Sequence, residues 1–96
     1  MDLKQAIQKL KTEGFARVDV REDPPKKFYG EHTHDSKAAY VVLEGELAFT
    51  MEGKTYTLKE DHRIDVKPNT IHFLKTGSKG CWYLVCQVAP AAEDPA

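Results

Sequence analysis

The sequence predicts a single small all-β domain, a barrel or a sandwich, with one short helix at its N-terminus. Three observations predict this class. The chain has 96 residues, a length typical of one domain. From Phe15 onward, apolar and polar residues alternate in short runs that end at turn-forming residues. The segment before Phe15 carries the apolar spacing of three and four residues that indicates a helix.

The predicted helix covers residues 1–14. Asp2 can cap its first turn, with Gln5 three residues later as in a capping box. Gly14 accepts the left-handed conformation that commonly follows a helix end. The apolar residues recur at a spacing that places them on one stripe of the helix. This stripe consists of Leu3, Ala6, Ile7 and Leu10.

Residues 15–89 are expected to form the β domain, in about eight short strands. The alternation begins with Ala16, Val18 and Val20 and stops at Asp23-Pro24-Pro25. Later strands are expected over residues 28–34, 38–44, 46–52, 54–59, 63–67, 70–76 and 81–89, with breaks at Gly45, Gly53, residues 59–61, Pro68-Asn69 and residues 77–80. The tail, residues 90–96, is rich in Ala, Pro and acidic residues and is expected to be disordered.

Charge and composition argue against several classes of partner. The net charge is -1 with no basic stripe, which gives no support to nucleic-acid binding. No apolar run is long enough to cross a membrane, and the amphipathic N-terminus does not look like a secretory signal. Cys81 and Cys86 lie five positions apart on one expected strand, so their side chains should point to opposite faces without forming a disulfide. Free thiols fit a reducing, cytoplasmic location.

Three of the four histidines form a candidate metal site. His32 and His34 are separated by one residue, which on a strand places both imidazoles on one face, about 6.5–7 Å apart. His72 follows a turn and can supply a third nitrogen from a distant strand. Imidazole ligands suit Zn, Fe, Ni and Cu. The expected cofactor is one divalent transition metal ion, one of these four or Mn. The alternative is simpler: a lone His-x-His pair is more often solvated surface, and His72 alone could be an ordinary buried histidine.

Two longer stretches resemble the motifs of the cupin family. Residues 32–45 read HTHDSKAAYVVLEG, similar to a first motif in which His-x-His precedes a glutamate and a glycine. Residues 58–72 read LKEDHRIDVKPNTIH, similar to a second motif that ends in a histidine. The resemblance covers about residues 26–76. It implies a double-stranded β-helix, or jelly-roll barrel, that holds a metal ion on His32, His34 and His72.

The chain departs from this family pattern at the position of the glutamate ligand. That position holds Ala38, whose side chain cannot bind metal. The resemblance therefore carries over three ligands, and a fourth could come from water or from a carboxylate such as Asp65. Three neutral imidazoles leave the full charge on a divalent ion and an open coordination position, which favours a small anionic ligand in the barrel.

Tyr40 is the candidate assisting residue. It lies two positions after Ala38, on the same strand face, and should point into the barrel. Its hydroxyl could orient a ligand or donate a proton, although an interior tyrosine is more often only packing. By contrast, His62 lies among charged residues in a turn and is expected at the surface. Cys86 is expected to be a small buried apolar residue.

These features leave three functions open. The first is a small metal-binding cupin that takes an anionic molecule, with the reaction unknown. The second is an iron-dependent dioxygenase of a small thiol or related compound, and the third is a non-catalytic ligand-binding or sensor barrel.

The strands at 38–44 and 70–76 are apolar on both faces, so the helix, another part of the sheet or a second subunit must cover their backs. Small cupins commonly pair, and a homodimer is expected.

Overall fold

The computed structural model describes residues 2–88, which form one helix and six antiparallel strands. The predicted all-β class with one N-terminal helix is confirmed. The predicted tail, residues 90–96, lies outside the described residues. Within residues 2–88, no helix is long and apolar enough to span a bilayer. The elements are α1 (Leu3–Thr12), β1 (Arg17–Asp23), β2 (Phe28–His32), β3 (Ala38–Met51), β4 (Lys54–Leu58), β5 (Arg63–Val66) and β6 (His72–Gln87).

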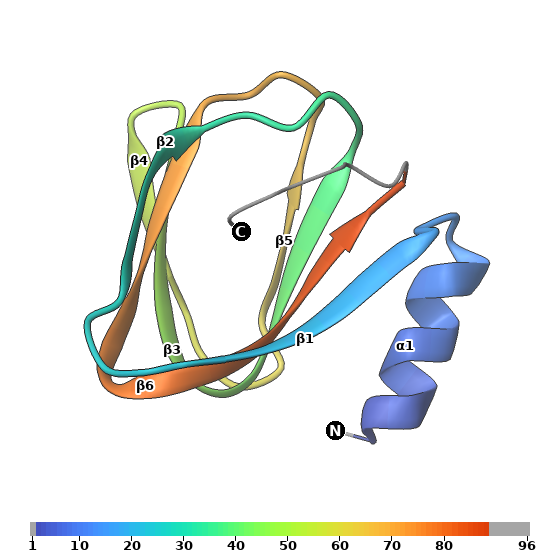
Figure 1. The fold of residues 1–96 in the computed structure, drawn as a ribbon, viewed down its shortest axis with the longest axis horizontal. Helices are drawn as coiled ribbons and strands as arrows, with labels where there is room; N and C mark the ends of the chain where they lie inside the picture. The colour runs from blue at the N-terminus through green and yellow to red at the C-terminus, as the bar shows by residue number, and fades with distance from the viewer. Residues whose placement is uncertain (1, 89–96) are drawn as a thin grey trace.

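The long strands β3 and β6 organise the fold. They pair with each other along most of their length. The first half of β3 also pairs with β5 and its second half with β4. In the same way, β6 pairs first with β2 and then with β1. The two strands therefore pass from one layer of sheet to the other, and Figure 1 shows the sheet curving round with α1 outside it.

This continuity corrects the prediction of about eight strands. Gly45 and residues 77–80, expected to separate strands, lie inside β3 and β6. The register between β3 and β6 shifts on either side of Gly45, as at a β-bulge. Gly45 and Gly80 both have positive φ, and a Cβ built on Gly45 would lie 2.3 Å from the Gly80 carbonyl oxygen. Here the glycines mark a bend where two strands approach closely, and not a turn between strands.

The barrel interior holds the larger of two apolar clusters. Side chains from both halves of β3 and β6 meet there, because alternate residues of a strand face the same side. Tyr40, Phe49 and Tyr83 are among the largest fully buried side chains. Next to this cluster, the Asp23 carboxylate at the end of β1 accepts hydrogen bonds from the hydroxyls of Tyr29 and Tyr83. Burial and this carboxylate raise the pKa of both tyrosines.

The second cluster lies on the outer face, under α1. Leu10 and Phe15 pack there against Ala39 and Val41 of β3 and Leu84 of β6, with Cys86 also in the cluster. The helix begins at Asp2, whose carboxylate accepts a hydrogen bond from the Gln5 amide, as predicted. The helix therefore covers the apolar back of the first half of β3, a role that the sequence left open between the helix, another part of the sheet and a second subunit.

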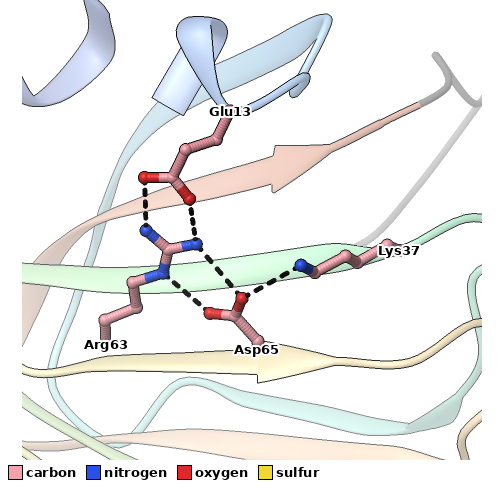
Figure 2. Close-up of polar contacts among 4 residues, drawn as sticks. All are labelled: Glu13, Lys37, Arg63 and Asp65. Atoms are coloured by element: carbon pink, nitrogen blue, oxygen red, sulfur yellow. Dashed lines mark hydrogen bonds and ion pairs between the residues drawn. The ribbon is translucent and has the colours of Figure 1, made fainter. Parts of the chain in front are cut away.

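A charged network ties the end of the helix to the sheet (Figure 2). The Arg63 guanidinium donates to both carboxylate oxygens of Glu13, at 2.7 and 3.0 Å, and to those of Asp65, at 2.7 and 3.1 Å. The Lys37 ammonium lies 3.5 Å from Asp65. The hydrogen bonds from Arg63 hold the pKa of Glu13 and of Asp65 below their usual values.

Replacing Arg63 by glutamine should lower the midpoint of thermal unfolding by a few degrees at neutral pH. The carboxyls of Glu13 and Asp65 both have a lower pKa in the folded protein than in the unfolded chain. Their contribution to the free energy of unfolding is therefore complete above the unfolded pKa values of about 4. It is lost as the pH falls through the folded-state pKa values. The difference between wild type and Arg63→Gln should therefore shrink towards pH 2–3. Arg17→Gln, which removes a pair within β1, is the control. A difference that stays constant with pH would contradict this role.

The two cysteines are free and buried on opposite sides of β6, as predicted. Cys81 faces the barrel interior and Cys86 faces the cluster under α1. Burial raises the pKa of each thiol to about 12, so little reactive thiolate forms near neutral pH. Native protein should therefore react slowly with Ellman's reagent, and denatured protein should release both thiols at once. Fast labelling of the native protein would contradict this burial.

Candidate metal centre

Three chain segments bring the three histidines together. His32 is the last residue of β2, and His72 is the first residue of β6 directly opposite it in the antiparallel pair. His34 lies two residues after His32, in the loop beyond β2, so the expectation of a strand over residues 28–34 was wrong at its end. The loop is held in place because the His34 carbonyl accepts a hydrogen bond of 2.7 Å from the Asn69 amide.

The imidazoles form a compact cluster. Ring centroids lie 4.3 Å apart for His32 and His72, 4.8 Å for His34 and His72, and 5.1 Å for His32 and His34. One nitrogen from each ring can be chosen so that all three lie within 4.8 Å of one another. His72 is fully buried, His34 is 5% exposed and His32 is partly exposed. The cluster can hold a metal ion, and His32 marks its most accessible side.

Backbone carbonyls orient two of the rings. The Nδ1 of His32 lies 2.7 Å from the Gly30 carbonyl oxygen, and the Nδ1 of His72 lies 2.8 Å from that of Thr70. A carbonyl oxygen only accepts, so each Nδ1 must carry the proton. In the neutral rings this leaves the Nε2 lone pair as the ligand atom, an arrangement typical of metal-binding histidines.

Gln87 orients the third ring. Its side-chain amide lies 2.9 Å from the Nδ1 of His34 and is buried at the end of β6. In the structure the amide nitrogen faces Nδ1 and donates to it, which leaves the proton of a neutral His34 ring on Nε2. Turning the amide over would present its oxygen to a protonated Nδ1 and leave the Nε2 of His34 as the ligand atom. Gln87 was not among the residues predicted from the sequence. The signal was present, since Gln87 continues the inward-facing series of Cys81, Tyr83 and Val85 with a polar side chain.

Aromatic side chains complete the surroundings. Tyr40 points into the barrel, and its hydroxyl lies 3.0 Å from the Nε2 of His34 and 3.2 Å from the Nε2 of His72. The ring of Phe49 stacks on His72, with centroids 5.3 Å apart and planes 15° from parallel. These rings are fully buried, so they shield the inner side of the cluster from bulk solvent.

The other candidate residues lie elsewhere. The Asp65 carboxylate is paired with Arg63 and Lys37 on the outer face of the sheet. The suggestion that Asp65 could be a fourth ligand was therefore wrong. Asp65 faces outward because it pairs with Ala39, whose side chain belongs to the cluster under α1. His62 is exposed in a turn, as predicted, and its Nδ1 accepts from the Lys59 amide. Ala38 is fully buried and offers no ligand atom.

Solved structures with the same fold come from several bacteria. An RmlC-like cupin from Shewanella frigidimarina is 20% identical, with a TM-score of 0.70 over 84% of this chain and 71% of that one. A cupin from Bacteroides fragilis is 18% identical, with a TM-score of 0.67 over 82% and 70%. The DMSP lyase DddQ from Ruegeria pomeroyi is 23% identical, with a TM-score of 0.71 over 80% of this chain and 40% of the lyase. At these identities the likeness shows the fold alone.

Sequence comparison gives the family directly. No curated protein matches the chain significantly. Residues 19–86, more than half of the chain, match the model of the cupin domain. This stretch runs from β1 to the end of β6 and contains all three clustered histidines. The predicted jelly-roll fold is thus confirmed, and the chain belongs to the cupin domain family.

Proposed function

We propose that this cupin holds one divalent transition metal ion on the Nε2 atoms of His32, His34 and His72 and binds a small anionic molecule there. The observation that carries the proposal is the convergence of three imidazoles from separate segments, with one ligand atom each within 4.8 Å. Carbonyl contacts at Nδ1 of His32 and His72 support it, because they leave the Nε2 of each of these two rings as its ligand atom.

The charge of the centre supports an anionic ligand. Neutral imidazoles do not reduce the charge of the ion, and the nearby Ala38 adds no carboxylate. A divalent ion so held would act as a Lewis acid and attract a carboxylate, a phosphate or a thiolate. The buried rings of Tyr40 and Phe49 exclude water from the inner side, which strengthens this attraction. The partly exposed His32 marks the side from which a ligand would enter.

Elemental analysis of protein purified without added metal tests the proposal. We expect about one transition metal ion per chain, which is lost in the His72→Ala variant and kept in His62→Asn. His62 is the matched control because it is an exposed histidine whose amide replacement keeps an acceptor for the Lys59 amide. Metal-free wild-type protein that also takes up no Zn, Fe, Ni, Cu or Mn on dialysis would contradict the proposal.

The same analysis separates the remaining alternatives. If iron is found, oxygen uptake with a panel of small thiols tests the dioxygenase alternative. If no metal binds, the non-catalytic ligand-binding barrel is the function left. The homodimer and the cytoplasmic location remain predictions. Sedimentation equilibrium of the purified protein tests the dimer.

A further inference from the structure

We infer that Tyr40 supplies a fourth protein ligand to the metal ion, through its phenol oxygen. This inference rests on the proposed three-histidine site. The hydroxyl of Tyr40 and the Nε2 atoms of His34 and His72 form a nearly equilateral triangle, with sides of 3.0, 3.2 and 3.1 Å. Three potential ligand atoms therefore lie close together, and each distance from the oxygen to a nitrogen is within 0.1 Å of the 3.1 Å between the two nitrogens.

The sides of this triangle match the edges of a metal coordination shell. With ligands at about 2.0–2.1 Å, neighbouring donor atoms lie about 3.3–3.4 Å apart in a tetrahedral shell. In an octahedral shell with the same bond lengths, they lie about 2.8–3.0 Å apart. The observed 3.0–3.2 Å lies between these two values. A single ion can thus contact all three atoms with small side-chain adjustments.

The position of Tyr40 on β3 also favours this role. Tyr40 lies two residues beyond Ala38, on the same inward face of the strand. Ala38 has no ligand atom, but the longer side chain of Tyr40 reaches the histidine cluster. Its ring is fully buried and packs against Phe49 with centroids 4.7 Å apart, which fixes the direction of the hydroxyl. The hydroxyls of Tyr29 and Tyr83 are directed instead to the Asp23 carboxylate.

Coordination by Tyr40 would change the charge of the centre. The oxygen–hydrogen bond of the phenol breaks, its proton passes to solvent, and an oxygen–metal bond forms. A divalent ion with three imidazoles and one phenolate has a single net positive charge, lower than that of the three-histidine site alone but still attractive to a small anion. Imidazole suits iron among other metals, and tyrosine is an established ligand of iron in proteins. Four protein ligands still leave two positions for a small molecule on a six-coordinate ion.

Ferric ion is the informative probe, because phenolate bound to iron(III) gives an intense charge-transfer band in the visible range. Metal-free wild type, Tyr40→Phe and Tyr29→Phe would be loaded with ferric nitrilotriacetate, desalted and analysed for bound iron and visible absorption. Tyr40→Phe keeps the ring that packs on Phe49, and Tyr29→Phe removes a different interior hydroxyl. We expect wild type and Tyr29→Phe to show the band, and Tyr40→Phe to bind iron without it.

A zinc titration of the same three proteins gives a second readout that does not depend on colour. Loss of the phenol oxygen should weaken zinc binding about 10- to 100-fold in Tyr40→Phe and leave Tyr29→Phe near wild type. Bound iron without a band in wild type, a band that survives in Tyr40→Phe, or unchanged zinc affinity would overturn the role of Tyr40 and leave the three-histidine site intact. Wild type that binds neither metal would overturn both proposals.

Discussion

Replacing Gly45 by alanine is expected to destabilise the barrel by about 3 kcal/mol or more. A Cβ at this position would lie 2.3 Å from the Gly80 carbonyl oxygen and 3.1 Å from the Cα of Cys81. These are backbone atoms, so β3 and β6 would have to separate at their bend. The positive φ of Gly45, +88°, adds strain for any residue with a side chain. For a small domain this is a large part of the total stability.

Guanidinium unfolding of Gly45→Ala beside Gly53→Ala measures the effect of the close approach. Gly53 also has a positive φ, +78°, but no atom lies within 4 Å of a Cβ built there. Gly53→Ala should therefore lower the free energy of unfolding only through backbone strain, by about 1 kcal/mol. Equal losses in the two variants would show that the contact between β3 and β6 is not what requires glycine at the bend.

Metal loading is expected to raise the thermal unfolding midpoint strongly. A ligand that binds only the folded state stabilises it by about 2.7 kcal/mol when its free concentration is 100 times Kd. For a domain of this size that corresponds to about 10–20 °C. The effect should be large here because the site joins three segments of the chain: the end of β2, the following loop and the start of β6.

Differential scanning calorimetry with and without zinc, followed by addition of EDTA, measures this shift. His32→Ala should lose most of it. His32 is the most exposed member of the cluster, so its replacement disturbs the apo protein least. His62→Asn should keep the full shift. If His32→Ala gained as much stability from zinc as wild type, the ion would be bound elsewhere.

The regular parts of the fold were predictable because they depend on local patterns. The stripe of Leu3, Ala6, Ile7 and Leu10 forms the helix, and Asp2 caps it as expected. Prolines after Asp23 end β1 where predicted. The bends were not predictable, because a glycine looks the same in a turn and in a strand that approaches another backbone. Only the pairing of Gly45 with Cys81 distinguishes the two cases.

The ligands of the candidate site were predictable from the sequence, but the hydrogen bonds that orient them were not. His32, His34 and His72 were recognisable from their spacing and family resemblance, and the inward direction of Tyr40 followed from strand alternation. The hydrogen bonds from Nδ1 to Gly30 and Thr70 depend on loop geometry that no residue type encodes. For the same reason the outward pairing of Asp65 with Arg63 was visible only in the fold.

An anomalous-scattering map of crystals grown from the metal-loaded protein tests the central claim most directly. The account predicts one peak per chain at a bonding distance of about 2.0–2.2 Å from the Nε2 atoms of His32, His34 and His72. Data collected on both sides of the absorption edge would identify the element. A map without a peak among the three rings, or with its only peak at other residues, would contradict the three-histidine metal site.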